Sequence, residues 1–286
     1  MTLSRADLLR LLEDNRLAPS RALGQNFVAD PNTVRRVVRL SGTGRGDHVV
    51  EVGAGLGSLT LALAESGACV TAIERDRWLV PVLREVLQER APGAAVRVVE
   101  ADAMELDWPG LLAGDDDWAL VANLPYNIAT PLVADLLDTV GQVRRMTFMV
   151  QREVAERLVA EPGGHAYGAV SVKVAYWAEA AILGSVPSSV FVPRPKVGSA
   201  IVGISRRPRP AVDPAAVTAE ALFAVVRAGF AQRRKMLRRA LFDLAVPTGA
   251  FELAGVDGQA RAEQLSVEQW GKLAAAITSL RGERLP

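Results

Sequence analysis

The sequence predicts an α/β protein, with a doubly wound parallel sheet followed by a small all-helical C-terminal domain. In the first 150 residues, short apolar runs alternate with segments of helical periodicity, a pattern typical of a parallel sheet with helices on its faces. After about residue 206, β-branched runs thin out and helical spacing takes over. Half of the 286 residues are apolar, enough to bury a sizeable core. We therefore expect two domains, residues 1–206 and 207–286.

The individual elements follow from the same pattern. A first helix is expected near the N-terminus, where Ser4 and Asp7 have the spacing of a capping box, and another is expected to begin at Asp30-Pro31. The expected strands are His48–Val52, Cys69–Ile73, Ala95–Val99, Trp118–Ala122 and Met146–Val150, with helices near 58–66, 76–90 and 130–139. Two β-like segments, near 181–186 and 199–205, are expected to extend the sheet, and Arg206–Pro210 is expected to be a linker.

Composition narrows the class of protein. The single cysteine, Cys69, cannot form a disulfide within the chain, which fits a reducing cytoplasmic compartment. We expect no membrane span, because no apolar run reaches about 18 residues, and the N-terminus lacks the pattern of a signal peptide. The net charge of +1 hides an asymmetry, because residues 184–286 carry 15 Lys and Arg against 8 Asp and Glu. A basic C-terminal part is typical of proteins that bind a polyanion.

A glycine-rich turn follows the first of the five expected strands, in the run Glu51-Val52-Gly53-Ala54-Gly55-Leu56-Gly57-Ser58. Glycines let the backbone turn sharply and approach a ligand, and the helix that follows presents free N–H groups at its N-terminus. A dinucleotide-binding turn requires Gly-x-Gly-x-x-Gly, but the third glycine here, Gly57, comes one position early. This spacing favours a nucleoside cofactor without a pyrophosphate, and we expect Glu51, Gly53, Gly55 and Gly57 to contribute to a site for S-adenosylmethionine.

Two acids follow the next two strands. Glu74 comes 21 residues after Gly53, the spacing at which an acid accepts hydrogen bonds from ribose hydroxyls. Asp102 follows the third strand, where a carboxylate could accept from the adenine amino group of the cofactor. Either acid alone would be an ordinary loop residue. Together with the glycine turn, they place ligand-binding groups at the carboxyl ends of three successive strands, where open α/β sheets bind ligands.

The fourth strand leads directly into Asn123-Leu124-Pro125-Tyr126. An adenine N6 amino group is a poor nucleophile, because its lone pair is delocalised into the ring. The side-chain oxygen of Asn123 and a backbone carbonyl at Leu124 or Pro125 could accept the two amino hydrogens, which favours a pyramidal nitrogen without a strong base or a metal. Pro125 would stiffen the loop, and Tyr126 would offer a ring face for the target base. An ordinary strand-to-helix turn is the alternative, which the preceding cofactor motif disfavours.

These motifs resemble those of the ribosomal RNA adenine N6,N6-dimethyltransferases of the bacterial KsgA type. The segments that carry the resemblance are Leu23–Phe27, Glu51–Gly57, Glu74, Asp102, Asn123–Asn127, Arg157–Ala160, Ala166–Gly168, Phe191–Val197 and Gln232–Lys235, in the family's order. The sequence departs from the family pattern at Gly198, where an acid is usual, and at Ala54, where proline is common.

The resemblance implies a Rossmann-like methyltransferase sheet, with S-adenosylmethionine bound by Asn26, the backbone of Val28, Gly53, Glu74, Asp102 and Asn123. It implies that Phe191 stacks on a flipped adenine opposite Tyr126. The implied substrate is two adjacent adenosines near the 3′ end of 16S rRNA, in a small ribosomal subunit or its precursor. It also assigns RNA and ribosome recognition to the helical C-terminal domain, and we expect the protein to act as a monomer.

A basic stretch in the C-terminal part predicts the RNA-binding surface. No acid occurs between Ala221 and Phe242, and apolar residues at helical spacing form an expected buried stripe. The cations of this basic stretch suit phosphate contacts, and they are Arg227, Arg233, Arg234, Lys235, Arg238 and Arg239. A solvated basic helix is the alternative from charge alone.

Three other functions remain open at this level. A resistance-type enzyme that methylates one adenine of large-subunit rRNA would share the cofactor turn, although such enzymes more often have isoleucine at the position of Leu124. A ribosome-assembly or transcription factor could use the same fold without catalysis. An adenine-N6 DNA methyltransferase is the most distant of the three.

Overall fold

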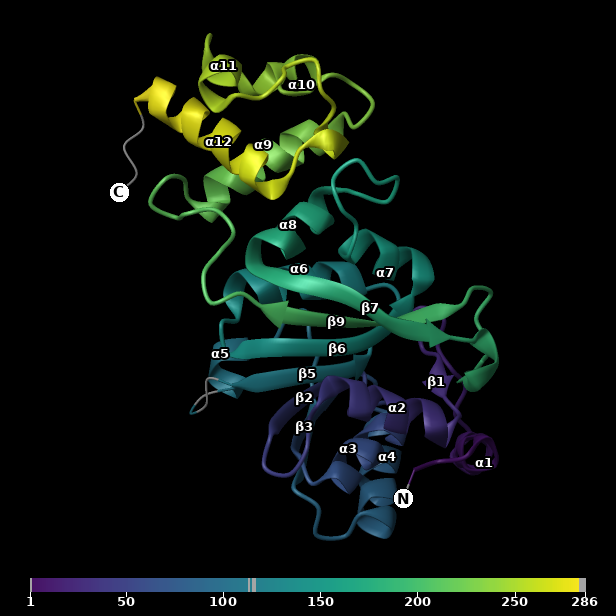
Figure 1. The fold of residues 1–286 in the computed structure, drawn as a ribbon. Coiled ribbons are helices and arrows are strands. Elements are labelled where there is room, and N and C mark those ends of the chain that lie inside the picture. Colours follow the sequence, from purple (N-terminus) through teal and green to yellow (C-terminus); the bar gives the residue numbers. More distant parts are fainter. Residues whose placement is uncertain (1, 113, 115–116, 283–286) are drawn as a thin grey trace. The chain divides into compact units, whose positions relative to one another are not determined.

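The computed structural model describes residues 2–112, 114 and 117–282 (Figure 1). The chain divides into two compact units. The first comprises the chain up to Ala155 together with Ala181–Ser205, and the second comprises Glu156–Ala180 together with the chain from Arg206 onward. This division differs from the expected one at residue 206, because Glu156–Ala180 lies with the C-terminal helices.

A seven-stranded sheet forms the frame of the first unit, in the order β4-β3-β2-β5-β6-β9-β7. The strands are β2 (His48–Val52), β3 (Cys69–Glu74), β4 (Val96–Glu100), β5 (Trp118–Asn123), β6 (Val143–Gln151), β7 (Ala178–Val186) and β9 (Ser199–Arg206). The strands from β2 to β6 run parallel to one another, and β9 is antiparallel to β6. The α/β class, the five expected strands and the two expected extensions are therefore confirmed.

Five helices of this unit were predicted and begin close to the expected residue, with one exception, whereas the short helices at 108–111 and 152–158 were not predicted. The helices are α1 (Arg5–Asp14), α2 (Pro31–Ser41), α3 (Ser58–Ser66), α4 (Leu79–Arg90), α5 (Trp108–Leu111) and α6 (Ala129–Thr139), and α7 (Arg152–Leu158) runs into the second unit. The Ser4 capping box and the Asp30 cap are both present. The exception is α4, expected from residue 76, because the carboxylate of Asp76 accepts the backbone N–H of Trp78 and holds a turn there.

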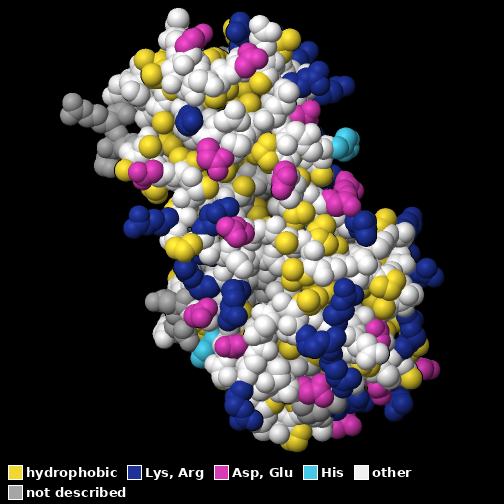
Figure 2. Space-filling model, viewed as in Figure 1, with side chains coloured by type: hydrophobic (Ala, Val, Ile, Leu, Met, Phe, Trp, Pro, Cys, Tyr) yellow, Lys and Arg dark blue, Asp and Glu magenta, His cyan; other side chains and the backbone are white. Residues whose placement is uncertain are grey.

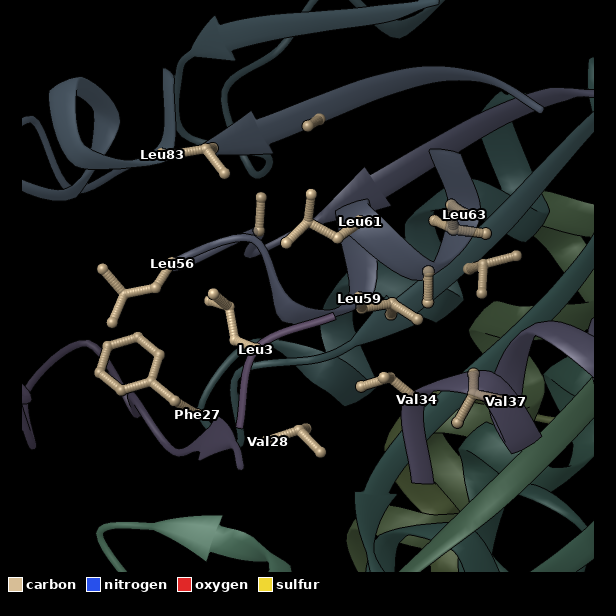
Figure 3. Packing of buried hydrophobic residues seen from close by; sticks show 14 of the residues in the cluster. Leu3, Phe27, Val28, Val34, Val37, Leu56, Leu59, Leu61, Leu63 and Leu83 are labelled. Atoms are coloured by element: carbon tan, nitrogen blue, oxygen red, sulfur yellow. The ribbon is translucent and has the colours of Figure 1, made fainter. Parts of the chain in front are cut away.

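A short antiparallel pair lies beside the glycine turn. β1 (Phe27–Val28) pairs with β8 (Phe191–Val192), which follows the single turn η1 (Ser188–Val190). The ring of Phe27 lies next to Leu56 of the turn, within the apolar core that α2, α3 and α4 share with the sheet (Figure 3). This packing fixes the segment Leu23–Phe27 beside the carboxyl ends of the strands.

The second unit is helical and has its own core around Trp270, which is fully buried. It comprises α8 (Ala169–Trp177), α9 (Ala219–Ala231), α10 (Leu237–Ala240), η2 (Phe242–Leu244), α11 (Ala250–Ala254), η3 (Ala262–Gln264) and α12 (Val267–Arg281). The aromatic side chains of the α8 region explain why it belongs here. The ring of Tyr176 lies 5.2 Å from that of Phe223, and the hydroxyl of Tyr167 donates to the carbonyl of Leu265 at 2.9 Å.

Within the described part of the chain, no helix combines the length and the apolarity needed to cross a membrane.

Candidate cofactor and catalytic site

The turn between β2 and α3 requires glycine at three positions. Gly53, Gly55 and Gly57 all have positive φ, at 75°, 57° and 91°, a region that other L-residues adopt at a cost. A Cβ on Gly53 would lie 3.2 Å from the ring of Pro125, and a Cβ on Gly55 would lie 3.0 Å from the ring of Phe27. The glycines therefore let the turn, the tetrapeptide and the β1 segment pack directly against one another.

Glu74, at the end of β3, braces this turn. One carboxylate oxygen accepts the backbone N–H of Gly55 at 2.7 Å, and the other accepts that of Asp76 at 2.8 Å. Burial raises the pKa of the Glu74 carboxyl above its ordinary value. Each oxygen keeps a further lone pair, and the side chain lines the pocket beside the turn, as a ribose-binding acid would.

Asp102 is held by a partner that the sequence does not reveal. The guanidinium of Arg75 lies 2.9 Å from one carboxylate oxygen of Asp102, and the other oxygen accepts the backbone N–H of Met104 at 3.0 Å. Arg75 and Asp102 both line the pocket. The ion pair fixes the orientation of the carboxylate that we expected to meet the adenine of the cofactor.

The side chain of Asn123 has a defined orientation. Its amide N–H donates to the backbone carbonyl of Asn26 at 2.8 Å, so its oxygen points away from that carbonyl. This oxygen is buried and has no hydrogen-bond partner among the described atoms. An unpaired buried acceptor costs free energy, and a ligand that donates a hydrogen bond would recover it.

The rest of the tetrapeptide refines the choice of the second acceptor. The carbonyl of Pro125 already accepts the N–H groups of Ile128 and Ala129, both at 3.2 Å, at the start of α6. The N–H of Leu124 donates to Met149 across the sheet. Of the two carbonyls considered from the sequence, that of Leu124 is therefore favoured.

The two expected stacking residues differ in their surroundings. Tyr126 is partly buried, its hydroxyl lies 3.1 Å from that of Ser199, and burial raises the pKa of its phenol. Phe191 is fully buried in the core and pairs with Val28 between β8 and β1. In this structure Phe191 therefore presents no accessible ring face to a base.

One pocket brings together most of the predicted cofactor residues. Asn26, Gly53, Gly55, Glu74, Asp102 and Asn123 all line it, as does Pro125. Six further predicted residues do not line it: Val28, Glu51, Gly57, Leu124, Tyr126 and Phe191. The lining residues that were not predicted include Leu23, Gly24, Gln25, Phe27, Arg75, Asn127 and Ile128. Of these residues, those of Leu23–Phe27 could have been predicted from the motif that they form. Nothing in the sequence indicates that Arg75 pairs with Asp102, 27 positions away.

A second, smaller pocket lies under the glycine turn. It is lined by Glu51, Ser58 and Asn123 among its polar residues, together with Val28 and Gly53. Glu51 is 1% exposed, and burial raises the pKa of its carboxyl to about 8. One Glu51 oxygen and the hydroxyl of Ser58 have no hydrogen-bond partner among the described atoms. The chamber thus contains three polar side chains, one of which is Asn123 with its unpaired oxygen.

Comparison with known proteins identifies the family. The family model described as "Ribosomal RNA adenine dimethylase" matches residues 18–279. The chain belongs to this family. It is 47% identical to "Ribosomal RNA small subunit methyltransferase A" of Cutibacterium acnes, over 97% of this chain and 94% of that protein. It is 46% identical to the protein of the same name from Magnetococcus marinus, over 92% and 94% of the two chains.

Solved structures agree on the fold. The structure titled "Crystal structure of 23S rRNA methyltransferase ErmE" has a TM-score of 0.65 and 27% identity, covering 88% of this chain and 99% of that one. A dimethyladenosine transferase from Plasmodium falciparum has a TM-score of 0.70 at 22% identity, covering 85% and 94%. These structures confirm the Rossmann-like fold, and the family model with the relatives confirms an S-adenosylmethionine-dependent methyltransferase acting on ribosomal RNA.

The pocket fits this cofactor on its own evidence. It combines Glu74, which accepts a hydrogen bond from the turn, with Asp102 beside Arg75 and the buried acceptor of Asn123. These groups suit the hydroxyl and amino donors of a nucleoside joined to an amino acid. Among the residues that the structure describes, no three His, Cys, Asp or Glu side chains are grouped as metal ligands.

The predicted RNA-binding cations occupy two kinds of environment in the second unit. Arg227, Arg234, Lys235, Arg238 and Arg239 are exposed. Arg233 is partly buried, forms an ion pair with Glu263 at 2.8 Å and donates to the carbonyl of His165. The stretch is also no continuous helix, because α9 ends at Ala231 and α10 begins at Leu237. Figure 2 shows Lys and Arg side chains gathered on the part of the surface where α10 lies.

Proposed function

We propose that this enzyme dimethylates the N6 amino groups of two adjacent adenosines near the 3′ end of 16S rRNA, in a small ribosomal subunit or its precursor. The relatives named as small-subunit methyltransferases, at 46–47% identity over nearly the whole chain, support this substrate. The observation that carries the chemistry is the oriented, unpaired oxygen of Asn123 beside the cofactor turn.

We assign the cofactor to the pocket at the carboxyl ends of β2–β5. Glu74 would accept from the ribose hydroxyls, Asp102 from the adenine amino group, and the turn at Gly53 would approach the amino acid part closely. Asn26 and Val28 would contribute from the β1 segment, and Gly55 and Gly57 by shaping the turn. S-adenosylmethionine supplies a methyl group that is already activated by a sulfonium.

Glu51 is assigned to the same site through its chamber. A buried acid with a raised pKa and an unpaired oxygen can accept from an ammonium group, and the chamber borders both Gly53 and Asn123. Pairing of the Glu51 carboxyl with a cationic donor would compensate the free-energy cost of its burial.

The target adenine would be held by the tetrapeptide. The oxygen of Asn123 and the carbonyl of Leu124 would accept the two amino hydrogens, which localises the nitrogen lone pair toward the methyl donor. Holding the two reactants in this geometry supplies most of the rate, because no proton needs to be removed by a strong base before the attack. Tyr126 would stack on the base.

Stacking of Phe191 on the target base, opposite Tyr126, requires a rearrangement of the structure. Since Phe191 is fully buried, it can stack on a base only if the β1–β8 pair shifts when RNA binds. Rotating a base out of an RNA helix also costs free energy, so an unpaired adenosine is the favoured target.

The exposed cations of the second unit would contact RNA phosphates. We assign this role to Arg227, Arg234, Lys235, Arg238 and Arg239. Arg233 has a structural partner in Glu263, so its contribution to RNA binding would require loss of that ion pair.

The test is methyl incorporation from labelled S-adenosylmethionine into purified small and large ribosomal subunits that lack the modification. We expect label in the small subunit alone, with two methyl groups on each of two adjacent adenosines. Label confined to the large subunit would instead establish methylation of large-subunit rRNA. That activity is the relevant alternative, because the chain is 27% identical to a 23S rRNA methyltransferase. A protein that binds subunits but transfers no methyl group would support the non-catalytic assembly factor.

A further inference from the structure

The exposed surface of residues 234–242 has an unusual composition. Leu237, Ala240 and Leu241 are buried and fix the orientation of α10. The exposed residues of this segment are four cations and two large apolar side chains, namely Arg234, Lys235, Met236, Arg238, Arg239 and Phe242. The segment therefore combines positive charge with apolar surface and contains no acid.

Phe242 is the more exposed of the two apolar side chains on this surface. It is 66% exposed, whereas each of the other six phenylalanines is buried or partly buried, all of them within the described residues. Single exposed apolar residues are common, so exposure alone carries little weight. The position is informative because a cation, Arg239, lies against the ring.

The guanidinium of Arg239 lies over the ring of Phe242, 5.3 Å from its centroid. The two residues are three positions apart, so the end of α10 and the turn that follows it bring them together. A planar guanidinium beside an exposed aromatic ring forms a surface on which a nucleic acid base can stack. The neighbouring Arg234 and Lys235 can contact the adjoining phosphates.

We propose that Phe242 and Arg239 form a stacking platform for one unpaired base of the ribosomal RNA, remote in sequence from the catalytic tetrapeptide. This inference rests on the proposed RNA substrate and adds a base contact to a surface otherwise assigned to phosphates. Stacking of this kind tolerates different bases, because each base has a π face. The platform therefore contributes affinity and register without reading sequence.

The direct test measures binding of a short single-stranded RNA by fluorescence anisotropy at several salt concentrations. Phe242→Ala should weaken binding about tenfold, the loss that removal of one stacked base typically causes. Phe242→Trp should bind at least as tightly as the unmodified protein. The slope of log affinity against log salt should stay unchanged in Phe242→Ala, because no phosphate contact is lost.

Two controls separate stacking from other effects. Leu253→Ala removes another exposed apolar side chain of the same unit, 62% exposed, and should not change affinity. A matched RNA in which the stacked nucleotide is abasic should bind the unmodified protein and Phe242→Ala equally. Each nucleotide is replaced in turn to find that position, and thermal melting verifies that the variants are folded.

The proposal is overturned if Phe242→Ala binds RNA as the unmodified protein does, or if its loss persists at every abasic position. Either result can occur while the enzyme still methylates small subunits, which leaves the proposed function intact. Failure of the unmodified protein to methylate small subunits would instead reject the proposed function, whatever Phe242 does.

Discussion

The side-chain amide of Asn123 donates to the backbone carbonyl of Asn26 at 2.8 Å, which joins the end of β5 to the segment before β1. These residues are 97 positions apart in the sequence. The contact determines which end of the amide faces the pocket, because the carbonyl of Asn26 can only accept a hydrogen bond. Under the proposed function, the free oxygen of this amide would be the acceptor for the adenine amino group.

Asn123→Ala should remove this acceptor and lower the rate of methyl transfer on the order of 100-fold, by analogy with loss of a single positioned hydrogen-bonding group in other active sites. Binding of RNA should be retained, because the proposed phosphate contacts lie in the second unit. The measurement is single-turnover methylation of small subunits together with RNA binding. Asn32→Ala, at an exposed position of α2, is the matched control. Full activity of Asn123→Ala would refute the mechanism.

Gly53→Ala should abolish cofactor binding, because the added Cβ would lie 3.2 Å from Pro125 in a backbone conformation with φ of 75°. Gly42→Ala is a sharp control, since Gly42 has φ of 67° and no atom within 4 Å of an added Cβ. Both variants should lose about 1 kcal/mol of stability from the backbone. Calorimetric titration with S-adenosylhomocysteine should then show a loss of affinity in Gly53→Ala alone.

Arg75→Ala should weaken cofactor binding a few-fold by releasing Asp102. The effect is expected to be modest and to shrink at high salt, because the arginine side chain is 59% exposed. Arg77→Ala, in the same loop, removes a cation that stacks on Trp78 instead and should leave affinity unchanged. Equal losses in the two variants would indicate a general effect of positive charge near the pocket.

The sequence predicted the sheet well because its central strands are mostly apolar and are followed by distinctive residues. The glycine turn, Glu74, Asp102 and Asn123 lie at such ends, and the parallel sheet brings them to one edge. Contacts between residues distant in sequence could not be predicted, and these include the pair of Arg75 with Asp102. The burial of Phe191 was missed for the same reason, since it depends on pairing with Val28 across the chain.

In the helical second unit, contacts between distant residues around α10 could not be predicted from the sequence either. The basic stretch was predicted as one surface of equivalent cations, but the chain turns between α9 and α10. This turn places Arg233 against Glu263 while its neighbour Arg234 stays exposed. Charge and spacing alone do not distinguish these two arginines.

Arg233→Ala and Arg234→Ala should therefore behave differently. Arg233→Ala should lower the melting temperature, because it breaks the contacts with Glu263 and His165. Arg234→Ala should melt normally but bind RNA more weakly, with the salt slope reduced by about one. Thermal melting and salt-dependent binding of both variants check this. If Arg233→Ala had the larger effect on the salt slope, its ion pair would have to open on binding.

Glu51→Gln should change how stability depends on pH. The carboxyl of Glu51 has a pKa raised from 4.5 to about 8 by burial, so the folded protein retains a proton that the unfolded chain releases. The contribution of the protonated Glu51 carboxyl to the free energy of unfolding is fully present below pH 4.5 and is lost as the pH rises through about 8. Glutamine has the same shape and stays neutral, so Glu51→Gln should match the unmodified protein at pH 4.5 and exceed it at pH 8.5 by more than about 1 kcal/mol.

Urea denaturation at several pH values measures this difference, and Glu89→Gln at an exposed position of α4 is the control. Parallel curves for the unmodified protein and Glu51→Gln would show that Glu51 is already ionised in the folded state. In that case the chamber beside Asn123 would hold a carboxylate before the cofactor binds.

Proton release on binding of S-adenosylhomocysteine, measured by calorimetry in buffers of different ionisation enthalpy, should be present in the unmodified protein near pH 7 and absent in Glu51→Gln. Its presence in both would assign the proton to another group.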